Sequence, residues 1–365
     1  MISMRIGRIL RWLGAAGGLL LIIVALPVLG IETACRAPGP ETEPITGHFG
    51  VSDPGYHMPV SSSVLSYPEW YIVYAYQDFA AILQHGDESA FPYLASISDY
   101  WRGFCVVNRI ASAQGEVDPS EKVMLYVIGL SFTAELGAKG AYETTIGRVS
   151  AWLRGTEKTT EDRLAVSVAE DYASFLQQRA WYEFPFWEQV RRLHRDTPFG
   201  HSSFRALERR FALTSEWTVK TAYAWIIGGG AELDPAALQI ESVVRGLDES
   251  DRGPGSNITL RRELGDGLAL VVTPRYAAFT HILLELAAHG RQIVEIAGND
   301  TILLTALAPQ GVDLELPNTR AIFAYPVRSR PGWHRDGMLV GVPSLIQTIQ
   351  ELQSRGAVLE HVYDY

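Results

Sequence analysis

The sequence predicts a transmembrane helix, then an all-α helical domain, then an α+β ferredoxin-like domain built from duplicated βαβ units. Three observations predict this: an uncharged run over residues 12–31, helical apolar spacing over residues 66–230, and alternating apolar residues after residue 234. A chain of 365 residues is long enough for about two domains. The predicted divisions are an anchor over 1–31, a tether over 32–65, the helical domain over 66–232 and the ferredoxin-like domain over 233–365.

The uncharged run over residues 12–31 fits a membrane helix, because 20 residues rising about 1.5 Å each match a hydrocarbon core of roughly 30 Å. Arg5, Arg8 and Arg11 precede the run, so the positive-inside rule places the N-terminus in the cytoplasm. We therefore expect a single-pass protein of the inner (cytoplasmic) membrane whose bulk is extracytoplasmic.

Two other interpretations of the N-terminal segment stay open. A cleaved signal peptide is one, although the run is longer than the 7–15 residues typical of such peptides. A lipid-modified Cys35 is the other, although Glu32 stands where a lipoprotein processing site needs an aliphatic residue. The tether over residues 32–65 is predicted from its proline, glycine and serine content.

The helical domain is predicted from start and stop signals. Ser66 and Glu69 match a capping box, which would begin a helix that continues to about Gln84. Further helices are expected from about Phe91 to Ala113, from Asp118 toward Leu153, from Thr159 or Thr160 to Phe184, and from Ser202 or Ser203 to Gly228.

Two similar strand–helix–strand units are predicted near the C-terminus. The segments Leu270–Pro274 and Leu339–Pro343 each precede a helix and a further strand. We expect both helices on one face of a mainly antiparallel sheet. The other expected strands are Leu238–Val244, Ile258–Leu264, Gln292–Ile296, Ile302–Ala308, Ala321–Val327 and Val358–Tyr363.

The stretches SYPEWYIVY, IGLSFTAELGAKGAYETTIGR and VEIAGNDTILLTALAP, together with the ending EHVYDY, resemble those of a group of bacterial membrane-anchored proteins with no known activity. The resemblance runs from about Ser66 to the C-terminus. It implies one architectural unit over that span and no particular reaction.

Composition limits the possible functions. The net charge of −10 argues against nucleic-acid binding, which depends on clustered cations. Cys35 and Cys105 are the only cysteines, which excludes a disulfide scaffold and a four-cysteine zinc site. Cys105 lies among apolar residues and is predicted to be a buried structural thiol.

Two rows of polar residues are candidate sites. His281, Glu285 and His289 lie on one helix face, but the row spans about 12 Å, so all three cannot reach one ion. An adjacent pair could bind an ion only with ligands from elsewhere. We expect a solvated face with no metal and no cofactor. The second row, over residues 135–143, joins Glu135, Lys139 and Glu143 among small residues. Close packing of another helix there would require ion-pair partners, with Arg148 as one candidate; a binding or catalytic site is the alternative.

The helical domain is rich in aromatic residues, with 28 between residues 67 and 230. Bulky core packing is one explanation, a surface resting on lipid headgroups is another, and an apolar ligand pocket is the third. The pocket would be walled by the first, second and fifth helices and lined by Glu69, Tyr71, Tyr74, Asp78, Tyr100, Trp101, Trp181, Tyr182 and Trp225.

The sequence therefore predicts a membrane-anchored extracytoplasmic binding or interaction protein. Its partners would be the membrane, through residues 12–31, and an apolar or lipid-like small molecule or an envelope protein. The alternative is a hydrolase-type enzyme that uses carboxylates of the helical domain.

Overall fold

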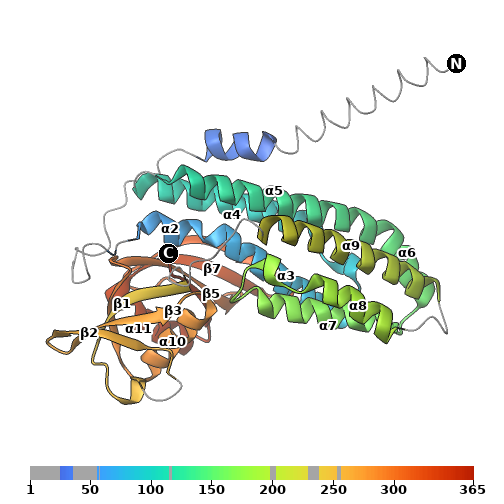
Figure 1. Ribbon diagram of the computed structural model, residues 1–365. Coiled ribbons are helices and arrows are strands. Elements are labelled where there is room, and N and C mark those ends of the chain that lie inside the picture. The colour runs from blue at the N-terminus through green and yellow to red at the C-terminus, as the bar shows by residue number, and fades with distance from the viewer. Residues whose placement is uncertain are drawn as a thin grey trace.

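A computed structural model describes residues 25–35, 56, 58–114, 117–197, 203–228, 238–252 and 256–365. The helices form an elongated bundle, and two sheets with two further helices lie at one end of it (Figure 1). The predicted order, helices followed by antiparallel sheets, is confirmed.

The bundle contains more helices than the sequence predicted. They are α2 (Val60–Leu65), α3 (Tyr67–His85), α4 (Tyr93–Gln114), α5 (Pro119–Tyr142), α6 (Arg148–Arg154), α7 (Thr160–Phe175), α8 (Phe186–Asp196) and α9 (Phe204–Gly228). Short turns, η1 (Glu88–Ala90) and η3 (Trp181–Glu183), lie between them, and a π-helical turn, Glu143–Gly147, joins α5 to α6. The predicted fourth helix ends early, at Phe175, and Pro185 precedes α8 instead of ending a helix.

Two of the predicted helix starts are confirmed and one is wrong. Asp118 accepts from the amide of Ser120 at 2.8 Å, and Thr159 forms a capping box with Asp162. Ser66 does not cap α3, because α2 continues almost directly into α3 and leaves Ser66 in a helical conformation. Its hydroxyl donates to the carbonyl of Ser63 at 2.8 Å.

The predicted tether is wrong at both of its described ends. Cys35 forms a disulfide with Cys105 of α4, so Cys105 is not a free thiol and the sulfur of Cys35 is not available for a lipid. At the other end, α2 belongs to the core, where the buried Ser63 hydroxyl donates to the carbonyl of Tyr363 at 2.7 Å. Residues 36–55 lie outside the described part of the chain.

The predicted membrane span falls mostly outside the described residues. Only residues 25–31 of it are described, and they belong to a helix over residues 25–34. Among the described residues, no helix combines the length and apolar character that a membrane crossing requires.

The C-terminal part consists of two halves with the same topology. The first half contains β1 (Gln239–Arg245), β2 (Thr259–Gly265), β3 (Leu268–Pro274), α10 (Ala277–Ala288) and β4 (Gln292–Ile296). The second contains β5 (Thr301–Pro309), β6 (Thr319–Pro326), β7 (Trp333–Gly341), α11 (Leu345–Ser354) and β8 (Val358–Tyr363). The strand orders are β2-β3-β1-β4 and β6-β7-β5-β8, and all neighbouring strands are antiparallel.

The two predicted strand–helix–strand units therefore occupy equivalent places, but the expectation of one shared sheet is wrong. Each half supplies a single helix, and α10 and α11 pack against each other in one core that both sheets line. Sharing the two helices lets each half cover the apolar face of its sheet.

The second sheet is buried on both faces. Along β5, Ile302 and Leu304 face the core around α10 and α11, whereas Leu303 between them belongs to the core of the helical bundle. Because successive side chains of a strand point to opposite faces, this alternation places the sheet between the two cores. Helices α2, α3 and α4 are thereby fixed against the C-terminal part (Figure 1).

The shared core predicts similar effects of truncation in both halves. Leu283 of α10 and Leu352 of α11 are fully buried, so Leu283→Ala and Leu352→Ala should each lower the free energy of unfolding by about 2–5 kcal/mol. Urea unfolding in mild detergent measures the free energy of unfolding. The control is Val358→Ala, at a half-exposed position, which should change this free energy by less than about 0.5 kcal/mol. A loss of stability for either leucine substitution as small as that for the control would contradict a shared core.

Candidate functional site

Three of the nine predicted ligand-binding residues form one aromatic cluster. The ring centroids of Tyr71 and Tyr100 are 6.3 Å apart, and those of Tyr100 and Trp101 are 5.2 Å apart. The Tyr100 hydroxyl donates to the carbonyl of Leu125 at 2.8 Å, and the Trp101 indole donates to Thr133 Oγ1 at 3.0 Å. Protein groups thus satisfy both polar tips, as expected for core packing.

Two others connect the helical bundle to the second sheet. The hydroxyl oxygens of Tyr74 and Tyr363 are 2.9 Å apart. Asp78 is buried and accepts hydrogen bonds from the backbone amides of Arg328 and Ser329, each at 3.2 Å. Both residues lie in the turn between β6 and β7. Their role is to hold α3 on the sheet.

The remaining four do not form one group, and only Trp181 and Tyr182 contact each other. Glu69 is exposed, and Trp225 is 81% exposed. Trp181 stacks on Tyr223 with ring centroids 5.0 Å apart, and Tyr182 contacts the edge of Trp181. The nine side chains therefore take part in several different contacts.

The polar row of α5 is paired with α9. The pairs are Glu135–Lys220 (2.7 Å), Lys139–Glu216 (2.9 Å) and Glu143–Arg209 (2.9 Å). The expected ion pairing is confirmed, but Arg148 is exposed and the partners come from the neighbouring helix. Close packing is confirmed too: Gly129 lies against the ring of Tyr100 of α4, where a Cβ atom would collide.

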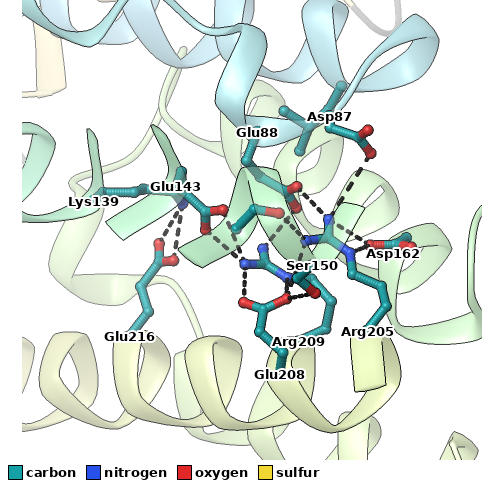
Figure 2. A network of polar contacts seen from close by, with 12 residues as sticks. Asp87, Glu88, Lys139, Glu143, Ser150, Asp162, Arg205, Glu208, Arg209 and Glu216 are labelled. Atoms are coloured by element: carbon teal, nitrogen blue, oxygen red, sulfur yellow. Dashed lines mark hydrogen bonds and ion pairs between the residues drawn. The ribbon is translucent and has the colours of Figure 1, made fainter. Parts of the chain in front are cut away.

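Two arginines of α9, Arg205 and Arg209, form the centre of a buried ion network (Figure 2). At 2.6–3.0 Å, Arg205 contacts the carboxylates of Glu88, Asp162 and Glu208, and Arg209 contacts those of Glu88, Glu143 and Glu208. These carboxylates come from η1, the π-helical turn, α7 and α9 itself. The network therefore joins four separate segments of the helical domain.

Negative charge exceeds positive charge in this network. Asp87, Glu88, Glu143, Asp162 and Glu208 contact the guanidinium groups of Arg154, Arg205 and Arg209. Burial raises the pKa of Glu143 to about 7. The charge of Arg209 lowers this pKa, and the charge of Glu88 raises it. For Glu88, the two arginines outweigh the effect of burial and lower the pKa. Glu143 is the carboxylate that carries a proton most readily.

The π-helical turn brings Glu143 into the network. Its carboxylate lies over Gly147, where a Cβ atom would collide with Oε2. Turns of this kind occur frequently at functional sites, so the turn makes Glu143 the first candidate for chemistry.

A small cavity lies beside the network. It has a volume of about 40 Å³ and is lined by Tyr76, Phe79 and the charged groups of Lys139, Arg209, Glu216 and Lys220, among others. None of the nine predicted ligand-binding residues lines it. Water molecules fit into such a space, whereas a small organic ligand needs roughly 300–1,000 Å³.

Helix α9 directs all of its charged residues inward and many of its large apolar residues outward, although Leu213 and Trp217 are buried. All six of its charged residues are buried or half-buried. Its exposed residues are Phe204, Leu207, Phe211, Ser215, Thr218, Val219, Ala222, Trp225, Ile226 and Gly228. A surface helix of a water-soluble domain has the opposite arrangement.

The chain from α5 to α6 shows the same reversal. Between Pro119 and Arg154, Arg148 is the only charged residue that is exposed. We define the apolar face as the exposed side chains Val123, Met124, Val127, Ile146, Val149, Trp152 and Leu153 with Phe204, Leu207, Phe211, Val219, Trp225 and Ile226 of α9. The exposed side chains of α6 and α9 meet at one end of the face. There Ile146, Val149 and Phe204 line an open hollow of about 440 Å³. The sequence pattern alone does not identify this face.

The row His281, Glu285 and His289 is exposed, as predicted. His289 Nδ1 lies 2.8 Å from Asp251. In the part of the chain that the structure describes, no three potential ligands are grouped to hold a metal ion.

Comparison with known proteins identified no relative: no family model, no curated protein and no solved structure matches the chain.

Protonation of Glu143 predicts a pH-dependent stability. Because its pKa is raised above the ordinary 4.5, the folded state keeps a proton that the unfolded state releases, and stability falls as pH rises from 4.5 to about 7. Glu143→Gln imitates the protonated form and should not show this loss. Relative to the variant, the free energy of unfolding of the wild type should fall by roughly 3 kcal/mol between pH 4.5 and 7.5, because each unit of pKa shift corresponds to about 1.4 kcal/mol. Urea unfolding at a series of pH values measures the difference, and a constant difference would contradict the assignment.

Proposed function

We propose that the protein is a membrane-anchored extracytoplasmic interaction protein that binds an apolar partner through the apolar face of α5, α6 and α9. The observation that carries the proposal is the orientation of α9, whose outward residues include no charge and whose six charged residues point inward. Contiguous exposed apolar surface of this kind marks sites of protein or membrane contact.

Export is supported by the disulfide between Cys35 and Cys105. Disulfides persist in oxidising compartments and are rare in the cytosol. The bond also fixes the chain just after residues 12–31 to α4, as expected if the helical domain is held at the membrane.

The alternative, a hydrolase that uses carboxylates of the helical domain, is supported by raised pKa values: burial raises the pKa of Glu143 to about 7 and also raises the pKa of Glu69 and of Glu121. The neighbouring cavity of about 40 Å³ has no room for a substrate, and Arg209 holds both carboxylate oxygens at 2.9 Å. These two facts favour a structural role for the network.

We also propose that each half of the C-terminal part is a ferredoxin-like unit that lacks its first helix. The shared strand order and the single helix between the third and fourth strands support this. The region would then serve as a rigid support for α2, α3 and α4.

Labelling of introduced cysteines tests both the orientation and the interaction. Val219→Cys lies on the apolar face, and Arg262→Cys lies at an exposed position of β2. In spheroplasts treated with a membrane-impermeant maleimide, Arg262→Cys should react at once and Val219→Cys should be protected at least several-fold.

Two results would contradict the proposal. Reaction of Arg262→Cys only after lysis would show that the domain is cytoplasmic. Equal reaction of both variants in spheroplasts would show that the apolar face is uncovered in its native setting.

A further inference from the structure

The apolar face lies beside the place where the predicted membrane segment joins the helical domain. Ile31 is buried, and Glu32 pairs with Lys122 of α5 at 2.6 Å and accepts from the hydroxyl of Tyr126 at 2.5 Å. Val123 of the apolar face directly follows Lys122. The end of the predicted anchor therefore docks on α5, the helix that carries Val123, Met124 and Val127 of the face.

No tether separates this anchor from the domain. The predicted span ends at Ile31, and the Glu32 pair and the Cys35 disulfide hold the next residues on α5 and α4. Further hydrogen bonds join the carbonyls of Ala34 and Cys35 to α4. Since consecutive Cα atoms are about 3.8 Å apart, the domain cannot move far from the bilayer surface.

The helix over residues 25–34 also exposes apolar side chains. Its Leu26 and Leu29 are both more than half exposed. Both belong to the uncharged run over residues 12–31 from which the anchor is predicted.

The chemistry of the apolar face suits a bilayer. Helices α5 and α9 are antiparallel, since Ser131 contacts Tyr223 and Tyr142 contacts Glu208. Trp152, 78% exposed at the end of α6, and Trp225, 81% exposed near the end of α9, therefore lie toward opposite ends of the face. Tryptophan is enriched where protein meets the membrane interface, and helices with one apolar face lie in that plane.

We infer that the bilayer that holds residues 12–31 also covers the apolar face, so that α5, α6 and α9 lie in its interfacial layer. This inference rests on the proposed function and names the partner as lipid. The inward charges of α9 are then shielded from the hydrocarbon by their own helix and paired within the protein.

Spin-label accessibility in liposomes tests this inference on the full chain. Nitroxide labels are attached at Val219→Cys and Val149→Cys on the apolar face and at Arg262→Cys as the control, with the native disulfide left intact. All three side chains are exposed, so the variants should fold, and unchanged urea midpoints would verify it. Lipid contact predicts frequent collisions with oxygen and few with a water-soluble nickel chelate at the two face positions. Their oxygen-to-nickel ratio should exceed that of Arg262→Cys at least several-fold.

Two other results would overturn the inference, and they are distinguishable. Protection from both oxygen and nickel, increasing with the protein density in the liposomes, would assign the face to a second copy and leave an interaction function in place. Nickel collisions as frequent as at Arg262→Cys would show a face in water and would also contradict the proposed function.

Discussion

Two buried arginines, Arg205 and Arg209, determine how the helical domain is built. A buried guanidinium group is tolerated only when carboxylates pair with it, and α9 cannot supply enough of them alone. Glu88, Glu143 and Asp162 come from three other segments, which must converge on α9. Once the charged side of α9 faces inward, its apolar side must face outward. The polar interior and the apolar surface are therefore two results of one constraint.

Such an arrangement is costly in water, where the exposed apolar side chains gain nothing from folding, but is favourable against lipid. The disulfide of Cys35 and the pair Glu32–Lys122 place this surface beside the predicted anchor. The C-terminal part completes the account by fixing the opposite side of the bundle. Its second sheet is covered by helices on both faces, and Asp78 and Tyr74 join it to α3.

Local patterns in the sequence predicted most of the elements, because capping residues such as Asp118 and Thr159 and the alternation in the strands act over a few residues. Features that depend on distant residues were missed. Ser66 matched a capping box, but α2 already occupied the chain before it. Cys105 matched a buried thiol, since nothing local identifies Cys35 as its partner. For the candidate site, the charges of α9 could be seen to recur on one side, but periodicity alone does not show which side faces the core. The usual expectation, apolar side inward, gave aromatic candidates such as Trp225 that the structure exposes.

Replacing one of the two arginines tests the central claim most directly. Arg209→Met keeps much of the side-chain volume and removes the charge that Glu88, Glu143 and Glu208 share. Arg148→Met, the same change at an exposed position nearby, is the control. The free energy of unfolding in mild detergent should fall by about 3–5 kcal/mol for Arg209→Met and by less than about 0.5 kcal/mol for Arg148→Met. Equal and small effects of the two substitutions would show that the network does not determine the orientation of α9.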